Sequence, residues 1–193
     1  RFKTHLANLP IYYEYKADGI GSTDAIKGTY LDNYKAIWDL YITDSTCDPK
    51  LLASKTGNDA VAEFVGEKAV FYQNGSWEWA KLTGTGDGQY GLDNLSMIPF
   101  YCGVAGEENA GLNCGTENCW AVNKNAKEED IQATLDFMYW VVTSEEGTTM
   151  LAEQFGPCPF KNAKTPENVF FAAANEYVAN GNYTVTWAFN WTP

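Results

Sequence analysis

The chain has 193 residues, of which 45% are hydrophobic and 15% are aromatic, so it is long enough to bury a core in one or two domains. Lys and Arg total 13 against 25 Asp and Glu, which gives a formal net charge of −12. This balance argues against nucleic acid and against an anionic membrane surface as partners, because both attract basic proteins. The sequence also lacks the run of about 18 apolar residues that a transmembrane helix needs.

The two ends of the sequence differ from ordinary termini. It begins with Arg1 and shows no basic and apolar leader, and its last residues include Trp187, Trp191 and Pro193. Because domain termini are usually loose and polar, we expect the sequence to be part of a longer chain.

Apolar residues recur at helical spacing in some segments and form short continuous runs in others. Trp38 and Trp140 fall on the apolar faces of two predicted helices, so both are expected to pack in the core. Asn125 and Thr143, each followed three residues later by Glu, are expected to begin two consecutive helices. Because helices alternate with a smaller number of strands, the predicted fold class is α/β. In chain order we expect helices at 28–43 and 60–66, a strand at 69–72, a helix capped by Ser76, strands near 96–101 and 119–123, helices at 125–142, 143–154 and 165–181, and a strand at 183–189.

Residue types that carry catalysis or bind metals are sparse. His5 is the only histidine, which excludes a multi-histidine site and favours a surface or ligand-lining role for His5. No serine lies in a Gly-x-Ser-x-Gly motif, and the glycine-rich loop at 84–88 lacks the lysine of a phosphate-binding loop. Of the three glutamate pairs, two fall at predicted helix starts, where acidic side chains interact favourably with the helix dipole; these are Glu128/Glu129 and Glu145/Glu146. We therefore expect no catalytic residue, no metal and no cofactor.

The cysteines lack the Cys-x-x-Cys spacing of zinc ribbons and thioredoxins. Their odd number leaves at least one thiol unpaired within the chain, and an exported protein could still bridge two of the others. The sequence does not assign a pairing, and isolated buried thiols are the favoured interpretation. The cysteines are Cys47, Cys102, Cys114, Cys119 and Cys158.

Trp77 is the strongest candidate for ligand binding that the residues themselves provide. It follows a predicted strand and the turn at Asn74 and Gly75, and ligands of open α/β sheets bind beyond the ends of the strands. Beside Asn74 and Glu78, an indole offers an apolar face together with hydrogen-bonding groups, which suits a sugar. Packing of Trp77 in the core is the alternative.

The order of motifs carries a resemblance to a known family. The stretch AVAEFVGEKAVFYQNGSWEW at 60–79 resembles the carbohydrate-type extracellular solute-binding proteins of ABC importers, whose members share a helix, a short strand and Asn-Gly-x-Trp-x-Trp. Met97–Phe100 is similar to the strand and proline that lead to the hinge of that family, and residues 115–123 are similar to its returning strand. TLDFMYWVVTSEEG and QFGPCPF resemble the helix pair and the turn that follow.

The resemblance implies a type II periplasmic-binding-protein fold with two α/β lobes and no enzymatic activity. Residues 1–103 would form part of the C-terminal lobe, 104–160 would cross the hinge into the N-terminal lobe, and 161–193 would return. Such a protein captures a sugar or oligosaccharide between its lobes and delivers it to the permease subunits of an ABC importer. It would be located outside the cytoplasmic membrane of a bacterium, as a lipoprotein or in the periplasm.

The resemblance also implies ligand-binding residues. Trp77 matches the sugar-stacking tryptophan of the family, and Asn74 matches the polar residue before it. Glu117 and Asn118 fall near the hinge strand that faces the cleft. The other expected contacts are Glu78, Arg1, His5, Trp187 and Trp191.

Two other functions stay open at the level of sequence. A carbohydrate-active hydrolase would need two separated carboxylates that bracket the scissile bond. A non-catalytic interaction module would bind a protein through surface aromatic residues. Turnover on a panel of glycosides would favour the first, and an aromatic patch outside any cleft would favour the second.

Overall fold

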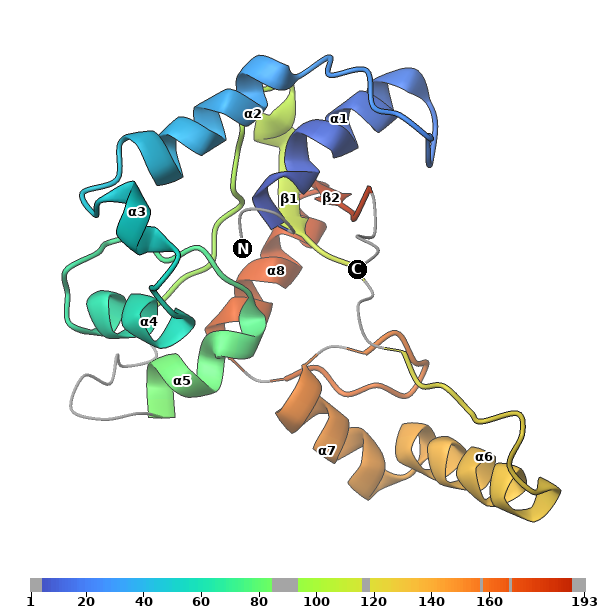
Figure 1. Cartoon of the computed structure of the whole chain (residues 1–193). Coiled ribbons are helices and arrows are strands. Elements are labelled where there is room, and N and C mark those ends of the chain that lie inside the picture. Colours follow the sequence, from blue (N-terminus) through green and yellow to red (C-terminus); the bar gives the residue numbers. More distant parts are fainter. Residues whose placement is uncertain (1–4, 85–93, 116–118, 157, 167, 189–193) are drawn as a thin grey trace.

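A computed structural model describes residues 5–84, 94–115, 119–156, 158–166 and 168–188 (Figure 1). A π-helical turn at Asp39–Thr43 continues α2, a 3-10 turn at Ser76–Glu78 precedes α5, and another at Glu107–Asn109 precedes β1. The helices and strands are α1 (Asn8–Asp18), α2 (Leu31–Trp38), α3 (Pro49–Leu52), α4 (Gly57–Val65), α5 (Trp79–Gly84), β1 (Ala110–Asn113), α6 (Glu128–Thr143), α7 (Glu145–Phe155), α8 (Val169–Ala179) and β2 (Tyr183–Val185).

The two strands pair in parallel, with Ala110 opposite Tyr183 and Asn113 opposite Val185. In Figure 1, α1 and α2 lie above the strands and α8 lies below them. The predicted α/β class therefore holds in a coarse form, as a mixed fold with a small parallel sheet between helices. Among the described residues, no helix has both the length and the apolar character needed to cross a bilayer.

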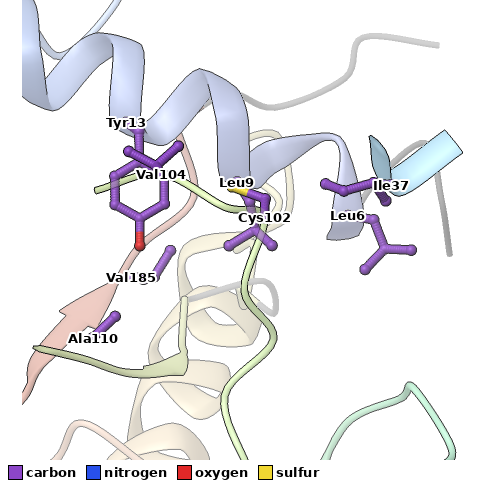
Figure 2. Packing of buried hydrophobic residues seen from close by; sticks show 8 residues of the cluster. All are labelled: Leu6, Leu9, Tyr13, Ile37, Cys102, Val104, Ala110 and Val185. Carbon is purple, nitrogen blue, oxygen red and sulfur yellow. The ribbon is translucent and has the colours of Figure 1, made fainter. Parts of the chain in front are cut away.

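The main core joins the beginning, the middle and the end of the chain. Side chains from α1, α2, the segment before β1, and both strands converge there, as Figure 2 shows. A second cluster lies between α4, α5 and α8, where the ring centroids of Trp79 and Phe170 are 5.2 Å apart. The residues of the main core are Leu6, Leu9, Tyr13, Ile37, Cys102, Val104, Ala110 and Val185.

Two buried carboxylates fasten loops to this core. Glu14 of α1 accepts hydrogen bonds from the backbone N–H groups of Lys27 and Thr29, both at 2.7 Å. Glu107 accepts the backbone N–H of Cys102 at 2.7 Å and that of Gly103. In each case the side chain supplies the acceptor that an irregular loop cannot find in a neighbouring strand.

α6 and α7 pack against each other as a hairpin that lies apart from the sheet in Figure 1. The prediction that Trp140 packs in the core is wrong. The buried residue of α6 is its neighbour Val141, and Trp140 is 45% exposed. The loop after α7 is tied back to it by Lys164, which bonds to Glu145 and lies 2.6 Å from the hydroxyl of Thr149.

α2 departs from its prediction in the same way. It begins at Leu31, within the predicted range, but its buried residue is Ile37, whereas Trp38 is exposed. The expectation that Trp38 packs in the core is therefore wrong. Amphipathic spacing identifies a helix, but the neighbours that the helix meets decide which side chains are covered.

Helix starts agree with prediction in position more than in the capping residue. α4 begins three residues earlier than expected, at the capping box of Thr56, and α7 is capped by Ser144 rather than by Thr143. The residue before α6 is Lys127, with no side-chain cap, so the expected cap by Asn125 is wrong. Ser76 does not cap its turn either, and α8 is capped by Asn168 instead of opening at 165.

Three predicted strands are absent from the described residues. Residues 69–72, 96–101 and 119–123 are irregular, and Val70 and Phe71 are 84% and 77% exposed. An apolar run becomes a strand only where another strand offers hydrogen bonds, and these segments have no such neighbour within the described ranges. β1, by contrast, was not predicted, because its short sequence contains Gly and Asn, which are rare in strands.

Candidate functional site

Three of the residues predicted to bind ligand lie together, although they are far apart in the sequence. The ring centroid of His5 is 5.6 Å from that of Trp77, with the planes at 78°, and 5.3 Å from that of Trp187, with the planes at 49°. Aromatic rings at these separations attract each other more strongly than their buried area alone accounts for. We call His5, Trp77 and Trp187 the aromatic cluster.

Trp77 and Glu78 are neighbours in one 3-10 turn but differ in exposure. Trp77 is 51% exposed, whereas Glu78 is only 3% exposed. The Glu78 carboxylate accepts hydrogen bonds from the hydroxyl of Tyr72 at 3.2 Å and from the ammonium of Lys81 at 3.1 Å. Both oxygens of the buried Glu78 carboxylate are therefore already bonded.

Asn74 is linked to Glu78 through the hydroxyl of Tyr72. The Asn74 amide donates to that hydroxyl at 2.5 Å, and its carbonyl oxygen accepts the backbone N–H of Gly75 at 3.0 Å. An amide has two N–H donors and an oxygen with two acceptor positions, so the bonds of Asn74 within the described part of the chain use one of each. The chain from Glu78 through Tyr72 holds the amide beside the turn that leads to Trp77.

Trp187 is held from the beginning of the chain. The fully buried side chain of Asn8 donates to the carbonyl of Thr186 at 3.1 Å and accepts the N–H of Ala188 at 2.7 Å. One amide thus bonds the backbone on both sides of Trp187. His5 lies three residues before Asn8, just ahead of α1, so the same short segment contacts Trp187 through a ring and bonds the backbone on both sides of it.

Two polar atoms near these residues are buried without a hydrogen-bond partner among the described residues, namely Nε1 of Trp187 and Oε1 of Gln73. Gln73 immediately precedes Asn74. Buried polar atoms are nearly always bonded to protein or water, so these two atoms are exceptions, and both are closed to solvent in this conformation.

The structure does not describe four of the predicted site residues, Arg1, Glu117, Asn118 and Trp191. Gly115, the last described residue before Glu117, lies against the indole of Trp187. Sequence reasoning did not identify Asn8, Tyr72 or Gln73. No local signal marks these residues, since Asn8 is an ordinary helix residue, Tyr72 ends a segment predicted to be a strand, and Gln73 lies between that segment and the predicted turn.

Metal binding and thiol chemistry find no support in the described residues. No group of three His, Cys, Asp or Glu side chains there could hold a metal ion. Of the five free cysteines, Cys102 fits the expected isolated buried thiol, whereas Cys47 and Cys158 are partly exposed and Cys114 and Cys119 are exposed. Burial, with the nearby Glu107 carboxylate as a smaller cause, raises the pKa of the Cys102 thiol to about 12.

Comparison with known proteins identifies the family. Residues 8–180 match the family described as bacterial extracellular solute-binding protein. Neither the curated proteins nor the solved structures include a significant match. The match spans most of the 193 residues, from the start of α1 to the end of α8, and this family is not enzymatic, which argues against the hydrolase alternative. The chain therefore belongs to the bacterial extracellular solute-binding proteins, which are the binding components of ABC transporters.

Proposed function

We propose that the solute is a neutral sugar or oligosaccharide, and that the aromatic cluster binds it. The observation that carries this proposal is the meeting of His5, Trp77 and Trp187 from three distant parts of the chain, with half of the Trp77 indole exposed. The C–H face of a sugar ring is apolar, so it can pack against the apolar face of an indole, as aromatic rings do.

The polar groups around the cluster complement hydroxyl groups. A hydroxyl both donates and accepts, so it can bond to the donor and acceptor positions of the Asn74 amide that the bonds to Tyr72 and Gly75 do not use. The nearest buried carboxylate, Glu78, already bonds to Lys81 and Tyr72, which leaves no unpaired charge there for a charged ligand. This set of groups favours a neutral polyhydroxylated ligand.

The delivery step and the lobe assignment form part of the same proposal. Residues 1–103 and 161–193 would form one lobe, and 104–160 would include the crossing and part of the other. The separate position of the α6–α7 hairpin in Figure 1 supports this division, and β1 would then lie in the crossing where it pairs with β2. The closed, loaded form would dock on the permease, with the protein held outside the membrane by a lipid anchor or in the periplasm.

Titration calorimetry tests the sugar proposal. The chain is titrated with glucose, xylose, maltose, cellobiose and raffinose at millimolar concentrations. The same titrations are then repeated on the variants Trp77→Ala and Trp140→Ala. A Trp side chain buries roughly 150–250 Å², and about half of that is open to a ligand at Trp77. At about 25 cal/mol per Å², the lost contact is about 2–3 kcal/mol, a roughly 30- to 100-fold increase in Kd.

Trp140 is the matched control, because it is about as exposed as Trp77 but lies on the α6–α7 hairpin. Trp140→Ala should bind the same saccharide with unchanged Kd. Binding of none of the five saccharides would contradict the sugar proposal. An unchanged Kd for Trp77→Ala would show that the aromatic cluster is not the site.

A further inference from the structure

Both indoles of the aromatic cluster lie directly against glycine backbone. A Cβ atom placed on Gly75 would overlap Cη2, Cζ3 and Cε3 of Trp77. A Cβ on Gly115 would overlap Cδ1 and Nε1 of Trp187. The rings therefore occupy the volume that any other residue at these two positions would fill with its side chain.

Backbone conformation does not explain these glycines. Gly75 has φ −125° and ψ 173°, which is extended backbone that every residue adopts, and Gly115 is not among the described glycines with positive φ. Gly103 and Gly106, in contrast, have φ of 86° and 88°, where a side chain would be strained. The absence of a side chain at Gly75 and Gly115 thus has a steric reason, and the group that needs the space is an indole in each case.

Further contacts also hold the two rings in place. His5 touches both indoles, and Asn8 bonds the backbone on each side of Trp187. Gly75 in turn donates its N–H to Asn74, which is anchored through Tyr72 and Glu78. Hydrogen bonds therefore fix one side of each contact. At Gly75 they hold the glycine backbone, and at Gly115 they hold the backbone of the Trp187 that lies against it.

We propose that Gly75 and Gly115 are positioning residues for ligand binding, which set the planes of Trp77 and Trp187 by leaving the space in which each indole lies. A side chain at either position would push the ring outward into the volume that the solute occupies. The proposal rests on the function proposed above, since it assigns a role to the rings in that site. It names two residues that do not need to touch the solute at all.

A double-mutant cycle without ligand tests the positioning. Overpacking by one methyl group costs stability, so Gly75→Ala should lower Tm by about 3–8 °C and change the near-ultraviolet circular dichroism of tryptophan. In the Trp77→Ala background the added methyl group has room, so Gly75→Ala should cause no further loss of Tm. Gly115→Ala and Trp187→Ala form the second cycle. Gly21→Ala is the control, because a Cβ at Gly21 meets nothing within 4 Å and its φ is not in the left-handed region.

The outcomes separate this inference from the sugar proposal. Additive losses in both cycles, or an unchanged tryptophan spectrum in Gly75→Ala, would overturn the positioning role whatever the protein binds. If the cycles are non-additive, Gly75→Ala should also weaken binding of the tightest saccharide of the panel at least tenfold, and Gly21→Ala should not. Non-additive cycles with unchanged saccharide affinity would instead show that the indoles are positioned but lie outside the binding site, which overturns their assigned role in ligand binding.

Discussion

The free energy of unfolding of this protein should depend on pH through the carboxyl group of Glu14. Its carboxylate is buried and accepts two backbone N–H groups at 2.7 Å, from Lys27 and Thr29, so it anchors the loop that joins α1 to α2. Burial alone would raise the pKa of Glu14, but the hydrogen bonds from Lys27 and Thr29 outweigh that effect and hold the pKa below its ordinary value. The ionised form is therefore the one that the folded protein stabilises.

Glu14→Gln should remove much of this stabilisation. A hydrogen bond to a charged group contributes about 1.5–3 kcal/mol, against about 1 kcal/mol for a neutral one. The amide retains one oxygen as acceptor, but it presents N–H donors to the second backbone N–H group. We expect the free energy of unfolding to fall by about 2–3 kcal/mol at pH 7, which corresponds to a decrease in Tm of roughly 4–12 °C.

The pH dependence follows from the direction of the shift. A carboxyl group whose pKa is lower in the folded than in the unfolded state contributes its full stability above the unfolded pKa, about 4.3 for Glu. That contribution is lost as the pH falls through the folded pKa. The difference in stability between the wild type and Glu14→Gln should therefore be largest near neutral pH and should shrink below about pH 4.

Urea unfolding followed by circular dichroism at pH 7 and pH 3.5 measures both quantities. Glu63→Gln is the matched control, since Glu63 is an exposed carboxylate on α4. Its substitution should change the free energy of unfolding by no more than about 0.5 kcal/mol. A stability difference for Glu14→Gln that is absent at pH 7, or that stays constant down to pH 3.5, would refute the assigned role of Glu14.

Two further predictions concern a thiol and a helix cap. Because Cys102 is buried and the pKa of its thiol is raised to about 12, iodoacetamide at pH 8 should alkylate the exposed Cys114 and Cys119 well before Cys102, as measured by peptide mass mapping. Equal rates in the native protein would contradict the burial of Cys102. Asn168 caps α8 by accepting N–H groups at 3.0 and 3.3 Å, so Asn168→Ala should cost about 1 kcal/mol in thermal unfolding while Asn168→Asp restores most of it. Loss of the same size in both variants would show that the cap does not stabilise the helix.

Local sequence patterns predicted much of the helical structure and part of the candidate site. Local start and stop signals predicted α4, α7 and α8 to within a few residues, because helical hydrogen bonds are local and need no distant partner. The same reasoning placed Trp77 at the start of a helical turn after Asn74 and Gly75. It also led, with the order of motifs, to the solute-binding family that residues 8–180 match.

Tertiary structure alone decided which side chains are covered and which strands exist. Trp38 and Trp140 satisfy the helical pattern, yet they are exposed, because the buried faces of α2 and α6 are those that meet other elements. Residues 69–72 are apolar enough for a strand, but a strand needs a neighbour to accept its hydrogen bonds, and that neighbour is chosen by the whole fold.

The same division applies to the aromatic cluster. Sequence reasoning named His5, Trp77 and Trp187 separately, from an inventory and from a resemblance, without any means of bringing them together. Their contact depends on the main core, which joins α1 to β1 and β2, and on Asn8, whose amide bonds the backbone around Trp187. Contacts between residues that are more than a hundred positions apart are fixed by packing and hydrogen bonds of the folded chain, and no local pattern encodes them.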